Sequence, residues 1–340
     1  MSKEVTVYSA MPLLNRPGPR RMLKERGWQV KFIVDVENRI HVPPHEVSGP
    51  LMDYADQIEF LVADITPLPR AFFEKAKNLR WAGMFGAGLN HIDIAAATDH
   101  NVLITNAAGA NSRSTAGLAI CFMFLLSRRI IPQHNQLMQG VWKSQMGNEI
   151  SEKTLGIIGL GSIGTHVAVA AKALGLNVIA YTRTPKPELA AQLGVKLVGL
   201  DELLQSSDYV SVNMSALPDG SAFIGKEEIA KMRKGACLIN VARGSLVDYN
   251  ALTEALMSGH LAGAGLDVYP HEPLTLEDQK AMAHPLFSLP NVVCTPHVGG
   301  MTEEATERVA AMCLAEVERM IKGERSPNAA NPLVYEKLGM

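Results

Sequence analysis

The fold of the second half of this chain is decided by the stretch Leu155-Gly156-Ile157-Ile158-Gly159-Leu160-Gly161-Ser162-Ile163-Gly164. The apolar residues up to Ile158 predict a buried strand, and the glycines that follow in a G-x-G-x-x-G pattern predict a tight turn into a helix. Each glycine then has a steric reason. Gly159 permits the turn, Gly161 lets the backbone approach a ligand, and Gly164 lets the helix pack closely on the strand.

A strand, a glycine turn and a helix in this order are typical of a dinucleotide site, because the pyrophosphate binds free N–H groups at the positive end of the helix. The glycine pattern by itself also occurs in turns that bind nothing, and its setting between strand and helix is what favours a ligand. The residues predicted to contact the dinucleotide here are Gly159, Gly161, Ser162, Ile163 and Gly164.

The kind of dinucleotide is indicated by the segment after the next predicted strand, Tyr181-Thr182-Arg183-Thr184-Pro185-Lys186. A protein that uses NAD commonly has an acidic residue at this point to bind the ribose 2′-hydroxyl, and this chain has Thr182 instead. Because Thr182 is uncharged and Arg183 and Thr184 can bind a 2′-phosphate, we favour NADPH over NADH. The alternative is that Arg183 and Lys186 belong to a solvated turn and that NAD binds without its usual ribose contact.

β-rich runs and helical patterns alternate along the chain, which predicts an α/β protein with parallel sheets covered by helices. The expected strands are Val5–Tyr8, Val30–Val34, Phe60–Val62, Arg80–Met84 and Val102–Thr105 in a first series, and Leu155–Ile158, Val178–Tyr181, Tyr209–Val212, Cys237–Val241, Ala262–Leu266 and Val292–Cys294 in a second. Six strands suffice for a complete doubly wound sheet. An apolar run from Ala116 to Leu126 predicts a buried helix that follows the first series.

The length of 340 residues exceeds a single ordinary core, so we predict two Rossmann-like, doubly wound domains. Residues 106–301 form the predicted dinucleotide-binding domain. Residues 1–105 and 302–340 form a flavodoxin-like, substrate-binding domain, to which a helix between Thr302 and Ile321 returns. The active site is expected in the cleft between the two domains, because open α/β sheets bind ligands at the carboxyl ends of their strands.

The composition points away from several classes of partner. A formal net charge of −2 gives no reason to expect nucleic acid or an anionic membrane. The N-terminus shows no export signal, and the run Ala116–Leu126 is too short to cross a bilayer, so we expect a cytoplasmic protein. The cysteines lie far apart without a Cys-x-x-Cys spacing, and we predict no metal site.

Three segments of the second series place a functional group directly after a strand. They are Asn240-Val241-Ala242-Arg243-Gly244, Tyr269-Pro270-His271-Glu272-Pro273 and Thr295-Pro296-His297-Val298-Gly299-Gly300. Taken singly, each side chain has an ordinary explanation: Arg243 as a strand cap, Glu272 in a solvated turn, His297 as a buried histidine. Their position at successive strand ends beside a glycine motif favours a shared function instead.

These segments, in this order and downstream of the glycine motif, resemble the D-isomer-specific 2-hydroxyacid dehydrogenases. The resemblance also covers the stretches Phe85–Asp93 and Met232–Gly244. It implies a nicotinamide-dependent oxidoreductase that reduces a small 2-keto acid, such as glyoxylate or hydroxypyruvate, to the D-2-hydroxy acid. By the same resemblance we expect a homodimer.

The resemblance also assigns the catalytic roles. Arg243 binds the substrate carboxylate and the adjacent keto oxygen, which suits the planar fork of a guanidinium. His297 protonates the keto oxygen as hydride arrives, and Glu272 binds the other ring nitrogen and raises the pKa of His297. Further implied contacts are Ala87 and Gly88 to the carboxylate, Asp267 to the nicotinamide carboxamide, and Val241, Ala242, Arg243, His297 and Gly299 to the cofactor.

Two other functions stay open. One is oxidation of D-3-phosphoglycerate, which Thr182 disfavours, as does the absence of a long segment after the final helix for a regulatory domain. The first β/α segment, Ser9–Arg21, carries arginines that can face a phosphate, but solvated loop arginines are the preferred interpretation. The second is a dinucleotide-sensing binding protein similar to the corepressors of this fold, against which no partner-binding arm is visible.

Overall fold

The strands form two parallel sheets in the computed structural model, which describes residues 5–37, 44–86, 88–89, 91–272 and 284–340. The chain divides into two compact units. The first contains the described part of Met1–Asn111 together with Met301–Met340, and the second contains Ser112–Glu272 and the described residues up to Gly300. The prediction of two parallel-sheet α/β domains is therefore confirmed.

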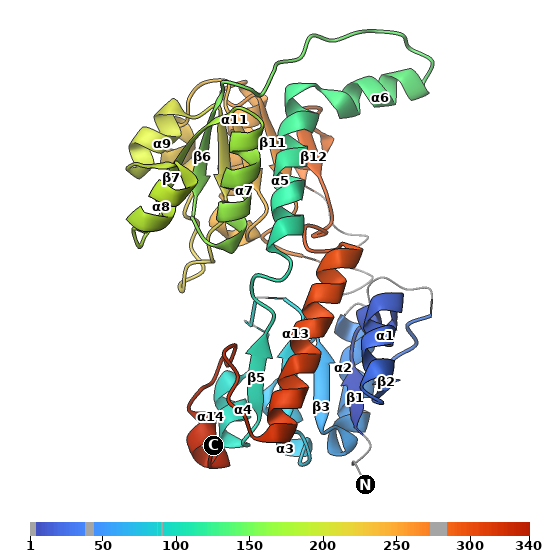
Figure 1. The fold of residues 1–340 in the computed structure, drawn as a ribbon. Coiled ribbons are helices and arrows are strands. Elements are labelled where there is room, and N and C mark those ends of the chain that lie inside the picture. The colour runs from blue at the N-terminus through green and yellow to red at the C-terminus, as the bar shows by residue number, and fades with distance from the viewer. Residues whose placement is uncertain (1–4, 38–43, 87, 90, 273–283) are drawn as a thin grey trace. The chain divides into compact units, whose positions relative to one another are not determined.

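The sheet of the first unit has the strand order β2-β1-β3-β4-β5, with parallel pairing throughout (Figure 1). Its strands are β1 (Thr6–Ser9), β2 (Gln29–Phe32), β3 (Phe60–Ala63), β4 (Trp81–Met84) and β5 (Leu103–Asn106). The helices are α1 (Pro17–Glu25), α2 (Pro44–Tyr54), α3 (Arg70–Lys75), α4 (Ile94–Asp99), α13 (Glu303–Lys322) and α14 (Val334–Leu338), with short 3-10 turns η1 (Pro12–Asn15) and η2 (Ala55–Gln57).

Both faces of this sheet are covered, which explains why its central strands are apolar at every position. All four residues of β3 and of β4 are buried. Leu61 and Met84 belong to the core beneath α2, α3 and α4, whereas Phe60 and Trp81 belong to the core beneath α1, α13 and α14. The alternation follows from the period of two along a strand.

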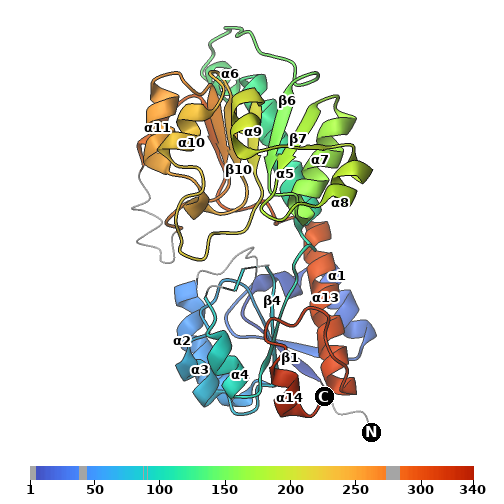
Figure 2. The same cartoon turned by 90° about the vertical axis from the view of Figure 1, so that its left-hand side faces the viewer.

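The sheet of the second unit has the order β12-β11-β10-β9-β6-β7-β8 (Figure 2). The strands are β6 (Thr154–Ile158), β7 (Asn177–Tyr181), β8 (Lys196–Leu197), β9 (Tyr209–Val212), β10 (Cys237–Asn240), β11 (Gly263–Leu266) and β12 (Val292–Cys294). The helices are α5 (Ser112–Ser127), α6 (Ile130–Met138), α7 (Ser162–Ala173), α8 (Pro187–Leu193), α9 (Leu200–Ser206), α10 (Lys226–Lys231) and α11 (Tyr249–Met257), with 3-10 turns η3 (Gly244–Leu246) and η4 (Pro285–Ser288).

The second sheet is also covered on both faces. Phe122 of α5 and Val167 of α7 pack with Ile157 and Ile239 on one face. On the other face, α9, α10 and α11 cover a separate core (Figure 2). The buried helix predicted from the run Ala116–Leu126 is α5, whose inward side chains are fully enclosed.

The elements that the sequence patterns did not predict include β8 and α6. The strand β8 is only two residues long and lies at the edge of the sheet, so it has too few residues to show a period. The helix α6 follows α5 after a bend of 65°. Arg129 takes up a left-handed conformation with φ of 51° at the bend, and Pro132 cannot continue the hydrogen bonding of α5.

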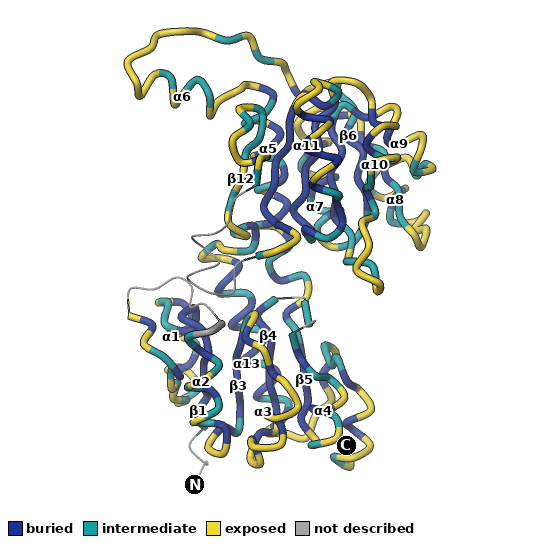
Figure 3. Tube along the Cα trace, turned by 180° about the vertical axis from the view of Figure 1, so that it is seen from behind, coloured by how far each residue is buried: buried dark blue, intermediate teal, exposed yellow. Residues whose placement is uncertain are grey.

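The arm, defined as residues 130–147, contains α6 and the segment after it and is mostly exposed (Figure 3). Within the described parts of the chain, no single helix is long and apolar enough to span a membrane. The pair α5 and α6 meets that criterion only when the two are counted together across their bend.

Candidate active site

The carboxyl ends of β10, β11 and β12 lie side by side in register. Leu266 of β11 is paired with Asn240 of β10 and with Cys294 of β12. Because the three strands are parallel, the segments that leave them start at the same edge of the sheet. The strand register therefore places the segments of Arg243, Glu272 and His297 next to one another within the second unit.

Asp267, the first residue after β11, organises the segment that carries the histidine. Its carboxylate is 1% exposed and accepts three hydrogen bonds, from Thr295 Oγ1 at 2.6 Å and from the amides of Val298 and Gly299 at 2.8 Å each. Its carbonyl oxygen accepts a bond from the His297 amide at 2.9 Å. These bonds hold His297 in a left-handed conformation with φ of 53°, which histidine adopts more readily than most residues.

Glu272 and His297 form a close pair, with 2.6 Å between Glu272 Oε2 and His297 Nδ1. An Nδ1–H that donates to the carboxylate leaves Nε2 free for another partner. The side chains are 33% and 44% exposed, so one end of the pair is open to small molecules. The structure thus brings together the two predicted members of an acid pair.

The pair shifts both pKa values in the directions that favour the charged forms. Burial by itself lowers the pKa of His297, but the hydrogen bond and charge of Glu272, with a further contribution from Asp267, raise the pKa above its ordinary value. Burial by itself raises the pKa of Glu272, but the bond and charge of His297, the Tyr269 amide and the charge of Arg243 lower it. Each partner therefore favours the charged form of the other.

Arg243 follows β10 in a fixed backbone setting. The Asn240 side chain donates to the Arg243 carbonyl oxygen at 2.9 Å and accepts from the Ala242 amide at 3.1 Å. The guanidinium is half-buried and donates through Nη1 to the Ala242 carbonyl oxygen at 2.7 Å. Its charge acts on both Glu272 and His297. The side chain is therefore near the pair and retains donors for a ligand.

The glycine turn after β6 has the geometry that its sequence predicts. Gly159 has φ of 100°, and a Cβ there would lie 2.9 Å from the backbone of Asn213. A Cβ on Gly164 would lie 2.1 Å from the Gly159 carbonyl oxygen, so the helix α7 can approach only without a side chain. A Cβ on Gly161 would have no neighbour within 4 Å. Gly159 and Gly164 are therefore required because a side chain would collide with backbone, whereas at Gly161 the lack of a side chain leaves the space beside the turn open.

That open space fits a dinucleotide phosphate. A side chain at Gly161 would occupy it, and the free amides at the start of α7, including those of Ser162 and Ile163, point toward the same end. The residues present therefore suit the pyrophosphate of a nicotinamide dinucleotide, which Gly159, Gly161, Ser162, Ile163 and Gly164 would hold.

The segment after β7 presents cations and hydroxyls but no carboxylate. Thr182 is half-buried and donates through Oγ1 to the Thr184 carbonyl oxygen at 3.0 Å. Arg183 is exposed, and Lys186 reaches back to within 3.5 Å of the Leu160 carbonyl oxygen in the glycine turn. The Lys186 ammonium thus lies over the turn that would hold the phosphates.

The remaining predicted contacts are placed as follows. Val241, Ala242 and Gly299 are buried at the same carboxyl edge as Arg243 and His297. Gly88 lies in the first unit, after β4, and Ala87 lies outside the described residues. The contacts of Ala87 and Gly88 with a substrate carboxylate stay predictions.

Sequence patterns missed Thr295 and Tyr269, which support the pair. Thr295 Oγ1 binds the Asp267 carboxylate, and the amide of Tyr269 donates to Glu272 Oε1 at 3.3 Å. The available signal was position alone, since Tyr269 lies three residues before Glu272 and Thr295 lies two residues before His297.

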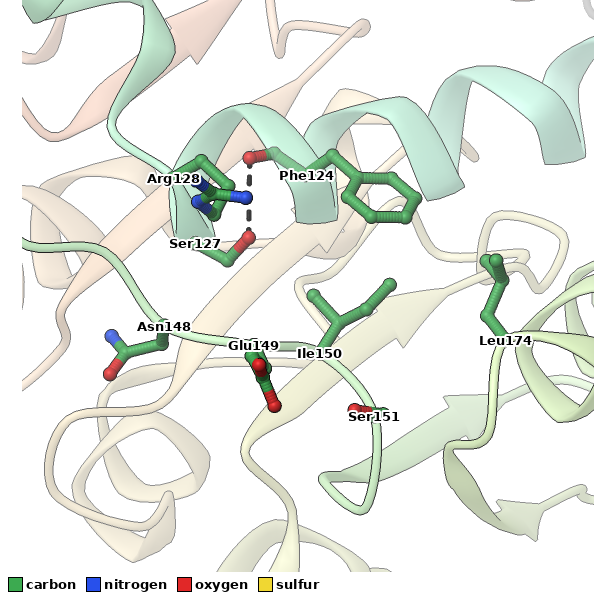
Figure 4. A pocket seen from close by; sticks show the side chains of 8 residues that line it. All are labelled: Phe124, Ser127, Arg128, Asn148, Glu149, Ile150, Ser151 and Leu174. Atoms are coloured by element: carbon green, nitrogen blue, oxygen red, sulfur yellow. Dashed lines mark hydrogen bonds between the residues drawn. The ribbon is translucent and has the colours of Figure 1, made fainter.

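A cavity of about 260 Å³ lies elsewhere in the second unit (Figure 4). It is lined by Phe124, Ser127, Arg128, Asn148, Glu149, Ile150, Ser151 and Leu174. These residues come from the ends of α5 and α7 and from the segment before β6, so they lie at the amino edge of the sheet. The cavity is therefore separate from the candidate site.

Comparison with known proteins agrees with this architecture. The sequence model described as "D-isomer specific 2-hydroxyacid dehydrogenase, NAD binding domain" matches residues 120–299, which is more than half of the chain. The chain therefore belongs to the D-isomer-specific 2-hydroxyacid dehydrogenase family, and its cofactor class is a nicotinamide dinucleotide. The resemblance noted from the sequence is confirmed.

Individual relatives carry two different names. The chain is 35% identical to a glyoxylate reductase of Thermococcus litoralis, over 85% of this chain and 88% of that protein. It is 40% identical to a D-3-phosphoglycerate dehydrogenase of Archaeoglobus fulgidus, over 80% of this chain and 51% of that protein. The chain thus spans about half the length of that dehydrogenase. A solved glyoxylate reductase from Paecilomyes thermophila matches with a TM-score of 0.78 at 28% identity, over 97% and 99% of the two chains.

Proposed function

We propose that this protein reduces a small 2-keto acid, such as glyoxylate or hydroxypyruvate, to the D-2-hydroxy acid with NAD(P)H. The observation that supports this most directly is the 2.6 Å pair of Glu272 and His297 at the same sheet edge as Arg243. An imidazolium and a guanidinium together suit a substrate with a carboxylate beside a carbonyl. The family and the glyoxylate reductase relatives support the same reaction.

Arg243 orients the substrate. Its guanidinium binds the carboxylate and the neighbouring keto oxygen through two of its N–H groups, which fixes the C1–C2 bond in one orientation. The fixed backbone between Asn240 and Arg243 limits how far the side chain can move. Because the substrate is already oriented when it is bound, the entropy lost on orienting it does not add to the barrier of the chemical step.

His297 supplies the proton. A bound, reduced nicotinamide would supply the hydride for C2. The proton on His297 Nε2 passes to the keto oxygen as that oxygen gains negative charge, and the neutral ring keeps its Nδ1–H on Glu272. Because the pKa of His297 is raised, the imidazolium is fully present at pH below the ordinary histidine value and is lost as pH rises through the raised value. Reduction should therefore slow on the alkaline side.

We propose NADPH as the preferred cofactor, held at the ribose by Thr182, Arg183 and Thr184. Thr182 has no charge to repel a 2′-phosphate, and Arg183 is exposed and ready to pair with one. NADH stays as the alternative, with Arg183 and Lys186 as solvated residues of the turn. The Asp267 carboxylate accepts two hydrogen bonds at Oδ1 and one at Oδ2, so Oδ2 keeps an acceptor site for the carboxamide contact that the family resemblance implies.

Phosphoglycerate oxidation is a second candidate, because the Archaeoglobus fulgidus relative bears that name. The arginines of the first β/α segment matter for this candidate, because they are the cations that can face a substrate phosphate. Arg16 pairs with Glu303 at 3.4 Å, Arg21 lies 4.0 Å from Glu307, and Arg20 Nε donates to Asn15 at 2.7 Å. Since each of these cations already has a partner in the first unit, we favour an unphosphorylated acid.

The test is the oxidation of NADPH and of NADH in the presence of glyoxylate, hydroxypyruvate, pyruvate and 3-phosphohydroxypyruvate. We expect kcat/KM to be at least about tenfold higher with NADPH than with NADH, as one charge-assisted contact predicts. Among the acids, the unphosphorylated ones should react fastest. A wide preference for NADH would contradict the cofactor proposal, and a preference for the phosphorylated acid would contradict the substrate proposal.

The matched variant is Thr182→Asp, which introduces an acidic residue of the kind that binds a ribose 2′-hydroxyl. This variant should lose activity with NADPH, because the new carboxylate repels the 2′-phosphate, and should gain activity with NADH. Equal losses with both cofactors would show that residue 182 does not contact the ribose. Absence of turnover with every acid, together with tight cofactor binding, would favour the dinucleotide-sensing alternative.

We propose that the protein is a homodimer and that the arm contributes to its interface. The arm exposes large apolar side chains, with Trp142 at 88%, Met146 at 89%, Met138 at 74% and Leu137 at 54%. Apolar groups that gather on one exposed segment are typical of an interface. Light scattering should give twice the chain mass of 36.8 kDa, and Trp142→Ser should shift the protein toward the monomer. A monomer at micromolar concentration would contradict the proposal.

A further inference from the structure

Tyr269 contacts Glu272 of the candidate acid pair and also the segment that carries His297. Its amide donates to Glu272 Oε1 at 3.3 Å. Its hydroxyl lies 2.9 Å from the carbonyl oxygen of Thr295, two residues before His297, and 3.1 Å from that of Leu266 at the end of β11. One residue therefore links the segment of the carboxylate to the segment of the imidazole.

The Tyr269 hydroxyl acts as a permanent donor. The residue is 8% exposed, and burial is the main reason that the pKa of Tyr269 lies far above its ordinary value, with Cys294 contributing. The group stays protonated over the whole working range of pH. The hydroxyl lies within hydrogen-bonding distance of the carbonyl oxygens of Leu266, at the end of β11, and Thr295, directly after β12, and it also bonds the Cys294 side chain. The hydroxyl thus bridges the two strands directly before their functional segments.

The ring of Tyr269 is held in place independently of its hydroxyl. It packs edge-on against Tyr249 at 6.3 Å and against Phe287 at 5.4 Å between ring centroids. The Tyr249 hydroxyl donates to the carbonyl oxygen of Val268, which directly precedes Tyr269. A phenylalanine at position 269 would retain both ring contacts and lose only the bridge.

Tyr269 also meets the segment of the third predicted catalytic residue. A Cβ on Gly244, next to Arg243, would lie 1.9 Å from the carbonyl carbon of Tyr269, so the two backbones are in direct contact. All three functional segments therefore contact this one residue: Gly244 beside Arg243, Glu272 itself, and Thr295 before His297.

We propose that Tyr269 is a positioning residue, which sets the distance and angle between Glu272 and His297 and thereby the proton affinity of the histidine. This inference rests on the proposed roles of Glu272 and His297. The reason is geometric: the 2.6 Å bond joins the tips of two segments, and its length depends on how far apart the ends of β11 and β12 are held. Without the hydroxyl, the sheet pairing and the hydrogen bonds to Asp267 set that separation, and none of them reaches the segment of Glu272.

The charged and titratable groups around these atoms are few. Glu272, Asp267 and Arg243 act on His297. Cys294, Tyr249 and Asp267 act on the Tyr269 hydroxyl. Of these groups, Glu272 supplies the largest contribution that raises the pKa of His297, so a change in that pKa reports on the pair.

The experiment is the pH profile of keto-acid reduction by Tyr269→Phe. We expect kcat to fall about tenfold, which corresponds to one lost hydrogen bond that fixes the reacting groups. The alkaline limb of the kcat/KM profile should move to lower pH, because a looser contact with Glu272 favours the imidazolium less. Cofactor affinity, measured by fluorescence, should stay within about twofold, because Tyr269 contacts none of the residues that would hold the dinucleotide phosphates.

Two further variants make the result decisive. Glu272→Gln removes the charge that raises the pKa of His297 and gives the lower limit for the alkaline limb; Tyr269→Phe should fall between it and the wild type. Tyr209→Phe is the matched control, because Tyr209 is a 5% exposed tyrosine of β9 whose hydroxyl bonds the Ser127 side chain at the other edge of the sheet. It should lose comparable thermal stability without any change in the profile.

A Tyr269→Phe profile that coincides with the wild type would overturn the inference. So would a loss of stability and rate with an unmoved alkaline limb, as in Tyr209→Phe, since that pattern indicates a structural role alone. If Glu272→Gln also leaves the limb in place, the proposed function of the pair fails, and this inference fails with it. The two failures are therefore distinguishable.

Discussion

Replacing His297 with asparagine should lower kcat for keto-acid reduction by roughly two to four orders of magnitude and leave cofactor binding within about twofold of the wild type. The reason is that asparagine cannot carry an ionisable proton, whereas the imidazolium is stabilised by its bond to Glu272. Steady-state kinetics with the best keto acid and a fluorescence titration with the cofactor measure the two quantities separately.

Asparagine is the appropriate replacement because of the backbone at this position. His297 has φ of 53°, a conformation that asparagine tolerates and that alanine or valine adopts at a cost. The three hydrogen bonds from Thr295, Val298 and Gly299 to the Asp267 carboxylate do not involve the imidazole ring, so they survive the change. A loss of rate then reports on the ring and not on the segment.

The matched control is His260→Asn, because His260 is a half-buried histidine of the same unit whose Nε2 lies 3.0 Å from the Ile229 carbonyl oxygen, away from the candidate site. This variant should retain activity within a few-fold. A His297→Asn enzyme that also stays within a few-fold of the wild type would remove His297 from the role of acid.

The sequence predicts the parts of the site that depend on neighbouring residues. Gly164 is required by its contact with the Gly159 carbonyl oxygen, and Gly159 is required by its own φ of 100°, so a short pattern contains both of these requirements. The close approach of Gly159 to Asn213 is a long-range contact that the pattern does not contain. Local patterns also predict the strands β6, β9 and β10, which are buried at nearly every position and mostly apolar because both faces of the sheet are covered.

Contacts between segments that are distant along the chain could not be predicted from the sequence. Asp267 accepts hydrogen bonds from residues 28 to 32 positions further along the chain, and no local pattern encodes that spacing. Tyr269 reaches Thr295 over 26 positions in the same way. These contacts depend on the pairing of β11 with β12, which becomes known only when the sheet order is known.

The departure at α6 has a different cause. The apolar run that forms α5 ends at Leu126, and only Ser127, Arg128 and Arg129 separate it from the apolar residues Ile130 and Ile131, so the sequence does not show whether the helix ends there. The chain turns where Arg129 adopts a left-handed conformation and Pro132 removes a donor. The overall hydropathy of the chain is ordinary, so it does not predict the exposed arm that results.

Arg243→Lys should be the second most damaging change, with kcat/KM lower by about 100-fold or more and most of the loss in kcat. An ammonium can bind the carboxylate or the keto oxygen, but it has no planar fork to bind both and orient C2. The structure adds a second reason. One guanidinium nitrogen donates to the Ala242 carbonyl oxygen at 2.7 Å and anchors the group, so the other N–H groups stay available to a ligand. A lysine that anchors in this way has fewer donors left.

The appropriate comparison for Arg243→Lys is the same substitution at Arg233, a 53% exposed residue of the second unit that pairs with Asp208. An exposed pair contributes little to stability, so Arg233→Lys should leave kcat and KM within about twofold. If Arg243→Lys behaves like this control, the guanidinium does not orient the substrate. If it raises KM alone and leaves kcat unchanged, Arg243 contributes the same binding energy to the substrate and to the transition state, and the proposed orientation of C2 must come from another group.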